Sequence, residues 1–306
     1  MAVIYSSHPL NARNPMKTPG HLFRDAVTQH QPLIIPGAIN AYCALMAEHA
    51  GHHALYLSGA GVANASHGLP DLGMTNLNDV LIDAQRITAA SQLPLLVDID
   101  TGFGEAFGIA RTIREMERAG VAAVHMEDQV AQKRCGHRPN KQLVTQTEMC
   151  DRLKAALDAR TDESFVIMAR TDSIASEGLN KALERMQAYV DTGADMIFAE
   201  AVTTLSDYKM ICNTLKVPVL ANITEFGKTP LFTQEELGEA GLAMVLYPLT
   251  AFRMMNKAAE TSYETLLREN SQESLISQMQ TREELYTHLS YHAFEDKLDK
   301  LFKEKK

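Results

Sequence analysis

The chain contains no tryptophan, no long apolar run and no excess of basic residues, and each absence excludes a class of protein. No segment approaches the roughly 20 apolar residues that a helix needs to cross a bilayer, and the first 20 residues hold no apolar stretch of signal-peptide length. With 29 basic and 38 acidic residues the formal net charge is −9, which argues against nucleic acid or an anionic membrane as the main partner. The four cysteines have no paired spacing, so we expect free thiols and a cytoplasmic location.

A short apolar run followed by an amphipathic, helix-like stretch recurs between about residues 33 and 268. The eight runs are LIIP (33–36), ALYLS (54–58), LPLLVDID (93–100), VAAVHMED (121–128), FVIMART (165–171), MIFAE (196–200), VPVLANI (217–223) and MVLYP (244–248). Continuous apolar strands that alternate with helices indicate a parallel sheet covered by helices. Eight units in roughly 230 residues predict an α/β fold of the (β/α)8 barrel type. A doubly wound open sheet is the alternative, but no G-x-G-x-x-G follows the first run.

The predicted organisation is a loose N-terminal tail (1–20), a barrel (21–269) and a C-terminal helical extension (270–306). The segment EELYTHLSYHAFEDKLDKLF (283–302) spaces its leucines at helical intervals and forms an apolar stripe that follows no barrel strand. This stripe packs either on its own barrel or on a neighbouring subunit.

Polar residues end the predicted strands, where a barrel builds its functional site. They are Ser58, Asp98, Asp100, Glu127, Arg170, Glu200 and Asn222. Carboxylates that converge on one mouth repel one another, so positive charge must offset them. Arg170 and Arg253 are the candidates, and their geometry suits a substrate with several carboxylates. Asn222 and Thr224 share a strand face and can donate to the same anion.

The Asp98-Ile-Asp100 motif predicts a metal site. Because side chains alternate along a strand, both carboxylates point the same way. Two carboxylates without histidine or cysteine in the motif favour a hard cation, with Mg²⁺ as the first choice and Mn²⁺ as the second. The alternative is a pair of aspartates that cap loop amides, but Glu127 and Glu200 at equivalent strand ends favour the metal.

The sequence AQKRCGH (131–137) places Cys135 among basic residues in the loop after the fourth strand. Positive neighbours stabilise a thiolate and should lower the cysteine pKa, so Cys135 is a candidate nucleophile or acid/base, with an incidental loop thiol as the alternative. The other three cysteines, Cys43, Cys150 and Cys212, stand in helix-like stretches and are typical of small core or interface residues.

Several segments, in order, resemble blocks of the isocitrate lyase and phosphoenolpyruvate mutase superfamily. They are YLSGAGVA, GLPDLG, LVDIDTGFG, EDQVAQKRCGHRPNK, MARTD, LANITEFG and LYPLTAFR, and they cover roughly residues 20–300. The K-[KR]-C-G-H form of the cysteine motif marks the carbon–carbon lyases of this superfamily. Among these lyases, the chain is most similar to those that act on 2-methylisocitrate.

The resemblance implies Mg²⁺-dependent cleavage of 2-methylisocitrate to pyruvate and succinate, a step of the methylcitrate cycle of propionate breakdown. It implies that Asp98 and Asp100 carry the metal, with Asp71 and Glu127 helping through water. The implied substrate-binding residues are Ser58, Gly59, Ala60, Gly136, His137, Arg170, Glu200, Asn222, Thr224, Arg253 and Arg282. It further implies a homotetramer that exchanges its C-terminal helices.

The chemistry of this cleavage assigns roles to two residues. The substrate C2 hydroxyl must lose a proton, for which Tyr56 is a candidate base, and the carbanion that leaves must gain one. We expect Cys135 to supply that proton as a general acid, and not to act as a covalent nucleophile.

Departures from the family pattern bear on the substrate. Isocitrate lyases are longer and carry tryptophan after the Ser-Gly of the first loop, where this chain has Ala60. Phe198 and Leu246 could line a small pocket for the extra methyl group, whereas Ala199 departs from the proline of many methylisocitrate lyases. Isocitrate and 2,3-dimethylmalate are the alternative substrates. A non-catalytic, metabolite-binding homologue is disfavoured by the intact Cys135 and Asp-x-Asp set.

Overall fold

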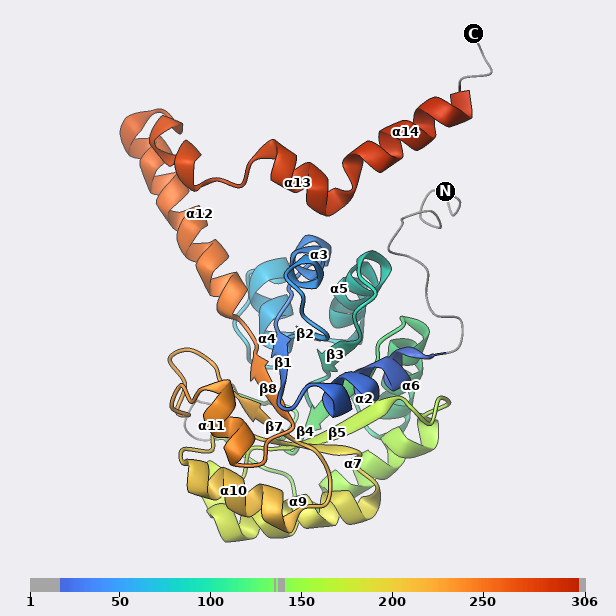
Figure 1. Ribbon diagram of the computed structural model, residues 1–306. Helices are drawn as coiled ribbons and strands as arrows, with labels where there is room; N and C mark the ends of the chain where they lie inside the picture. The colour runs from blue at the N-terminus through green and yellow to red at the C-terminus, as the bar shows by residue number, and fades with distance from the viewer. Residues whose placement is uncertain (1–16, 135, 137–140, 303–306) are drawn as a thin grey trace.

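The computed structural model describes residues 17–134, 136 and 141–302, and a ring of parallel strands forms its centre (Figure 1). The strands are β1 (Leu33–Pro36), β2 (Leu55–Leu57), β3 (Leu95–Asp98), β4 (Ala123–Glu127), β5 (Val166–Thr171), β6 (Met196–Ala199), β7 (Val219–Asn222) and β8 (Met244–Tyr247). They pair in the order β1-β8-β7-β6-β5-β4-β3-β2. A bridge between Gly37 and Tyr56 joins β1 to β2 and closes the ring. The prediction of a (β/α)8 barrel is confirmed, and the open sheet is wrong.

Helices surround the ring in the order that the sequence predicts. They are α3 (Ala41–His49), α4 (Gly59–Gly61), α5 (Leu77–Ala90), α6 (Ala106–Arg118), α7 (Gln146–Ala159), α8 (Ile174–Glu177), α9 (Leu179–Thr192), α10 (Leu205–Thr214) and α11 (Gln234–Glu239), with a π-helical turn at Val62–Ser66. Local sequence sets their ends: α5 begins at a capping box in which Asn76 and Asp79 bond each other's backbone N–H groups. The predicted Cys43, Cys150 and Cys212 helices are confirmed as α3, α7 and α10.

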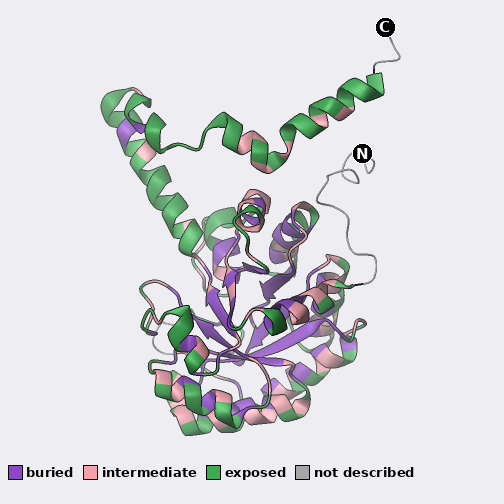
Figure 2. Ribbon diagram, in the orientation of Figure 1, coloured by how far each residue is buried: buried purple, intermediate pink, exposed green. Residues whose placement is uncertain are grey.

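The core has two layers, which follow from the alternation of side chains along each strand. In β3, Leu96 belongs to the apolar cluster inside the ring, whereas Leu95 and Val97 pack in the cluster between the ring and the helices. Phe198 and Leu246 also point inward. The strands are therefore buried on both faces, as Figure 2 shows.

Helix α2 (Pro19–Gln29) seals the amino-terminal end of the ring. Its Phe23 is fully buried in the inner cluster. Its Arg24 donates to Ser164 O at 2.8 Å and to Asp195 Oδ1 at 2.6 Å, which tethers the helix to the residues before β5 and β6. The bottom of the barrel is thus closed by a helix from before β1, so the functional site must open at the other end.

The C-terminal segment leaves the barrel as an arm (Figures 1 and 2). It contains α12 (Thr250–Glu269), a 3-10 turn (Glu273–Gln278), α13 (Arg282–Leu289) and α14 (Tyr291–Phe302). The predicted stripe spans two helices instead of one, because Ser290 has φ +53° and ends α13. Helix α13 lies against α3, where Tyr42 donates to Gln280 at 2.7 Å. Leu298 is 55% exposed, so the stripe on α14 is uncovered in the single chain.

Across the described residues, none of the helices combines the length and apolarity that a membrane span requires.

Candidate active site

A cavity of about 270 Å³ lies at the carboxyl ends of the strands. Its lining includes eleven of the predicted site residues: Tyr56, Ser58, Ala60, Asp71, Asp98, Gly136, Arg170, Glu200, Asn222, Thr224 and Arg253. The cavity therefore gathers side chains from most of the strands at one mouth, as the positions of the strand ends predict.

The Asp-x-Asp motif forms one wall together with Lys133. Asp98 and Asp100 are each 5% exposed, and the Gly59 N–H donates to Asp98 Oδ2 at 3.1 Å. Lys133 Nζ lies 2.7 Å from Asp100 Oδ1 and also bonds Asp71 Oδ1. Two carboxylates, those of Asp71 and Asp100, therefore contact one buried ammonium group, which belongs to the loop that carries Cys135.

Burial and neighbouring charges separate the two aspartates. Burial and the Asp98 carboxylate together raise the pKa of Asp100 to about 6, although Lys133 opposes the shift. Burial alone would raise the pKa of Asp98 too, but Lys133, Arg170 and the backbone N–H of Asp100 lower it. Burial works against the charge on Lys133, yet Asp100 and the other nearby carboxylates raise its pKa well above its ordinary value. The two carboxyl groups thus differ, because the pKa of Asp98 lies below its ordinary value and that of Asp100 is raised to about 6.

The carboxylates of this wall can supply some, but not all, of the ligands that a hard divalent cation needs. A Cβ placed on Gly59 would lie 3.1 Å from Asp98 Oδ2 and 3.2 Å from Asp100 Oδ1, so the glycine keeps the space before both carboxylates open. Across the described residues, no three acidic, histidine or cysteine side chains meet closely enough to hold a cation alone. Two carboxylates supplemented by water and substrate oxygens are the set that Mg²⁺ accepts.

Tyr56 lies beside this wall and shares a hydrogen bond with His125. The distance from Tyr56 Oη to His125 Nε2 is 2.9 Å, and Asp98 Oδ2 is 3.5 Å away. Burial, with Asp98, raises the pKa of Tyr56 well above 10, so the phenol is neutral in the free protein. Burial lowers the pKa of His125 to about 4 and leaves it uncharged. His125 is therefore a hydrogen-bonded core residue and not a cation.

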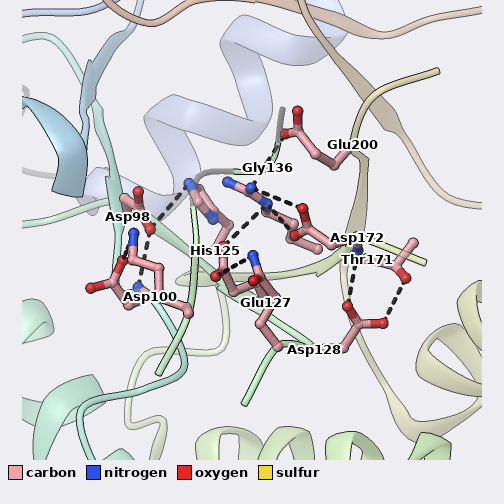
Figure 3. A network of polar contacts seen from close by, with 12 residues as sticks. Asp98, Asp100, His125, Glu127, Asp128, Gly136, Thr171, Asp172 and Glu200 are labelled. Carbon is pink, nitrogen blue, oxygen red and sulfur yellow. Dashed lines mark hydrogen bonds and ion pairs between the residues drawn. The ribbon is translucent and has the colours of Figure 1, made fainter. Parts of the chain in front are cut away.

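Arg170 contacts three of the carboxylates labelled in the polar network of Figure 3, those of Glu127, Asp172 and Glu200. Its Nε lies 3.0 Å from Asp172 Oδ2 and 3.3 Å from Glu127 Oε2, and its Nη2 lies 3.5 Å from Glu200 Oε2. Burial opposes the charge on Arg170, but the carboxylates, Asp172 foremost, raise its pKa well above its ordinary value. The guanidinium also lies 4.9 Å from the centre of the Phe198 ring. The predicted counter-charge is thus fixed in place, ready for an anionic substrate.

Gly136 is the described residue of the Cys-Gly-His turn. A Cβ at this position would lie 2.5 Å from Arg170 Nη2 and 2.7 Å from Glu200 Cγ, so only glycine allows the backbone to approach this closely. Cys135 and His137 lie outside the described residues. Their neighbours Arg134 and Gly136 both line the cavity.

The opposite wall carries the remaining polar groups. Asn222 Nδ2 donates to Glu200 Oε2 at 3.2 Å, and Thr224 is 7% exposed. Arg253 extends from α12, with its Nε 3.4 Å from Glu225 Oε2 and its guanidinium 5.5 Å from the Phe226 ring centre. The cavity lining therefore includes one half-exposed arginine in addition to the buried Arg170.

Four predicted residues are absent from the described lining. Gly59, Asp100 and Glu127 lie directly behind it, through their contacts with Asp98, Lys133 and Arg170 respectively. Arg282 is different, because it begins α13 on the exposed arm. The structure of one chain does not bring Arg282 to the cavity.

Sequence reasoning missed several buried or half-buried polar groups that support the site. They are Lys133 as an aspartate partner, Gln129, Lys141, Asp172 and Glu225. Lys133 and Lys141 flank the cysteine motif and look like surface lysines in the sequence. Only their burial, at 5% and 3% side-chain exposure, reveals that each compensates a carboxylate.

Comparison with known proteins agrees with this geometry. The family model described as phosphoenolpyruvate phosphomutase matches residues 23–267. The 2-methylisocitrate lyase of Vibrio cholerae is 63% identical over 296 residues, with 94% of this chain and 96% of the relative covered. That of Salmonella typhimurium is 58% identical, with 95% and 99% covered. A crystal structure of 2,3-dimethylmalate lyase superposes with a TM-score of 0.86 at 33% identity, covering 94% of this chain and 96% of the other.

The matched length, the shared barrel and the Asp-x-Asp wall beside a cysteine motif point to one family. The chain belongs to the phosphoenolpyruvate mutase/isocitrate lyase superfamily and, within it, to the family of 2-methylisocitrate lyases.

Proposed function

We propose that the chain is a Mg²⁺-dependent carbon–carbon lyase that cleaves 2-methylisocitrate to pyruvate and succinate, in propionate breakdown through the methylcitrate cycle. The observation that carries the proposal is one cavity in which the Asp98 carboxylate wall faces the Arg170 guanidinium, beside the two residues that flank Cys135. The Vibrio cholerae and Salmonella typhimurium relatives support the choice of substrate.

The proposed division of labour places the metal on one side and the carboxylates on the other. Asp98 and Asp100 hold the cation, with Asp71 and Glu127 supporting it through water. When bound, Mg²⁺ supplies the positive charge that acidifies the C2 hydroxyl group of the substrate. The backbone and hydroxyl of the Ser58–Ala60 turn bind the end that becomes pyruvate. Ser58 Oγ accepts from the Gly61 N–H at 3.2 Å, which leaves its own proton free to donate.

The other substrate carboxylates lie among the remaining polar residues of the cavity. These are Gly136, His137, Arg170, Glu200, Asn222, Thr224 and Arg253, with Arg282 supplied by the arm of a neighbouring subunit. The positive charge of Arg170 and the amide of Asn222 spread the negative charge that develops on C3 as the C2–C3 bond breaks.

Two proton transfers complete the reaction. Tyr56 is the proposed base for the C2 hydroxyl proton. Its raised pKa keeps it a neutral phenol in the free protein, so it can accept this proton only after passing its own proton on, to the uncharged His125 Nε2 that lies 2.9 Å from its Oη. The bonding electrons pass to C3, and the Cys135 thiol donates the proton that turns the carbanion into succinate.

The proposed assembly is a homotetramer in which C-terminal helices exchange between barrels. The support is the exposed apolar surface of the arm, where Met254, Tyr263 and Leu267 are 70%, 73% and 85% exposed. The proposed domain limits are a tail to residue 20, a barrel to 269 and the extension beyond. Helix α2 begins at Pro19 and α12 ends at Glu269.

The test is cleavage by the purified protein of 2-methylisocitrate and isocitrate, each with Mg²⁺, with Mn²⁺ and with chelator. Metal-dependent release of pyruvate with little glyoxylate supports the proposal and a methyl pocket beside Phe198 and Leu246. Because one buried methyl group is worth about 1–3 kcal/mol, slow glyoxylate release is expected as well. Dominant glyoxylate would overturn the substrate choice. Neither product would direct the search to 2,3-dimethylmalate.

A further inference from the structure

The loop between β4 and α7 is pinned at its base. Gln129 and Leu143 form an antiparallel bridge, and the Val130 N–H donates to Gln142 O at 3.0 Å. The loop returns to its starting point here, and three of its described residues, Lys133, Arg134 and Gly136, line the cavity. The position of this cavity wall therefore depends on what holds the loop above its base.

The Gln129 side chain holds the loop on one side of Cys135. Its Oε1 accepts from the Arg134 N–H at 3.0 Å, and its Nε2 donates to Arg134 O at 2.8 Å. The same Nε2 donates to Glu127 Oε1 at 3.0 Å. A fully buried amide thus bonds both backbone groups of the residue before Cys135 and ties them to the end of β4.

Lys141 holds the loop on the other side of Cys135. Its Nζ donates to Gly136 O at 2.6 Å and to Asp172 Oδ1 at 2.8 Å. Asp172 in turn accepts from Arg170 Nε at 3.0 Å. The backbone on both sides of the cysteine is therefore tied to the ends of β4 and β5, where the substrate-binding groups stand.

Packing alone does not require an amide at position 129. A methionine of similar length would fill the space without burying donors and acceptors, and burying polar groups is costly unless each finds a partner. Here every polar atom of the Gln129 side chain is used, and two of its three bonds go to one backbone residue of the loop. The arrangement matches the need of acid catalysis, in which the donor must lie within hydrogen-bond reach of the carbon that receives the proton.

We propose that Gln129 is a positioning residue of the lyase reaction, which fixes the loop backbone at Arg134, directly before Cys135 in the chain, while Lys141 fixes it at Gly136, directly after Cys135. This inference rests on the proposed function, in which Cys135 is the proton donor. Gln129 acts through the loop and does not touch the substrate.

The experiment compares Gln129→Met and Gln129→Glu with Gln187→Met, a control on the remote helix α9. Gln129→Met should lower kcat by about 10- to 100-fold, because a displacement of about 1 Å costs roughly that much, while KM changes less than about threefold. Gln187→Met should keep wild-type kinetics and thermal stability. In Gln129→Glu the protonated side chain again offers one donor and one acceptor, so its kcat relative to wild type should rise as the pH falls. The same ratio for Gln129→Met should stay flat.

Turnover of Gln129→Met within about threefold of wild type would overturn the inference. So would a Gln129→Glu variant whose kcat relative to wild type does not rise as the pH falls. This result does not depend on the methionine variant and decides the matter if that variant does not fold. In a Cys135→Ser background, Gln129→Met should lower the residual turnover less than about threefold, because both changes act through the same group. If Gln129→Met lowers turnover by the same factor in the Cys135→Ser background as in the wild-type protein, positioning through Cys135 is contradicted.

Alkylation separates failure of this inference from failure of the proposed function. The rate at which iodoacetamide modifies Cys135, measured by peptide mass spectrometry, needs no turnover. Gln129→Met should change this rate about fivefold or more relative to Gln187→Met, because thiol reactivity follows the local environment. An unchanged rate overturns the inference even if the chain cleaves 2-methylisocitrate. A changed rate in a protein without lyase activity leaves the clamp standing and the proposed function wrong.

Discussion

Individual residues at the cavity carry charges that depend on their neighbours. Asp98, Asp100 and Glu127 are buried, and burial raises the pKa of Glu127 well above its ordinary value although Arg170 stands 3.3 Å away. Lys133 and Arg170 supply the compensating charge. A change at one of these groups therefore alters the ionisation of the others, and measurements at several pH values report on the site.

Cation binding should depend on pH through Asp100. The pKa of this carboxyl group is raised to about 6, so protons compete with the cation at mildly acidic pH. The affinity for Mg²⁺ should be constant above about pH 7 and fall by up to about tenfold per pH unit below about 6. Titration calorimetry between pH 5 and 8 measures this dependence, and Mn²⁺ gives the same profile by paramagnetic resonance. In Asp100→Asn, binding should be weak at every pH.

His125 should make the fold sensitive to acid. Its pKa is lowered from 6.5 to about 4. Between these two pH values the unfolded chain binds a proton at His125, whereas the folded chain does not. Stability is therefore unaffected by His125 above pH 6.5 and falls as the pH drops from there to about 4, by a total of about 3 kcal/mol. Urea unfolding at pH 7 and 4.5 measures the loss. His125→Asn should show a smaller loss between these two values, and an unchanged loss would contradict the assignment.

Cys135→Ser tests the acid role at the level of one atom. A serine hydroxyl group is a much weaker acid than a thiol, so kcat should fall by about 10²- to 10⁴-fold, a typical loss for a missing general acid. The dissociation constant for succinate should stay near the wild-type value in calorimetry. Cys150→Ser, on the outer helix α7, is the matched control and should be fully active. Retained turnover in Cys135→Ser would remove the cysteine from the mechanism.

At the scale of elements, the apolar runs predicted the strands closely. LIIP coincides with β1, and MVLYP exceeds β8 only by its proline. The runs work because most of the strands are buried on both faces, which leaves an unbroken apolar signal. The π-helical turn at Val62–Ser66 and the break at Ser290 carry no such signal, since both depend on backbone geometry that several residue types can adopt.

The position of helix α2 depends on the absence of a side chain at Gly20. A Cβ on Gly20 would lie 2.4 Å from the carbonyl carbon and oxygen of Ser164, which belong to fixed backbone. Gly20→Ala should therefore displace the helix and lower the free energy of unfolding by about 1–3 kcal/mol, the usual cost of overpacking. Urea denaturation measures the change. Gln29→Ala, at the exposed end of the same helix, should change stability by less than about 0.5 kcal/mol.

At the scale of the whole molecule, the arm should govern assembly. The full chain should sediment as a tetramer, because exposed apolar side chains along α12 and α14 need a partner surface. A chain that ends at Asn270 should sediment as a smaller species at the same concentration. Equal sedimentation of both as monomers would contradict the proposed exchange of helices.

The sequence could predict the barrel, the mouth and most of its lining, because periodicity decides which residues end strands. It could not predict the buried ion pairs of Lys133 and Lys141, since pairing across a loop depends on tertiary distances. The sequence also could not predict where Arg282 lies relative to the cavity. This residue stands on the arm, and it can reach a cavity only in an assembly of several chains.

The seal made by α2 also constrains when the molecule can fold. Arg24 reaches Asp195, and β1 pairs with β8 through Leu33 and Met244. On a ribosome, α2 and β1 therefore emerge long before their partners. The barrel cannot close until β8 has been synthesised, and contacts so distant in sequence form slowly. Until then the apolar surface of β1 stays exposed, so the yield of folded protein should depend on chaperones more than its final stability suggests.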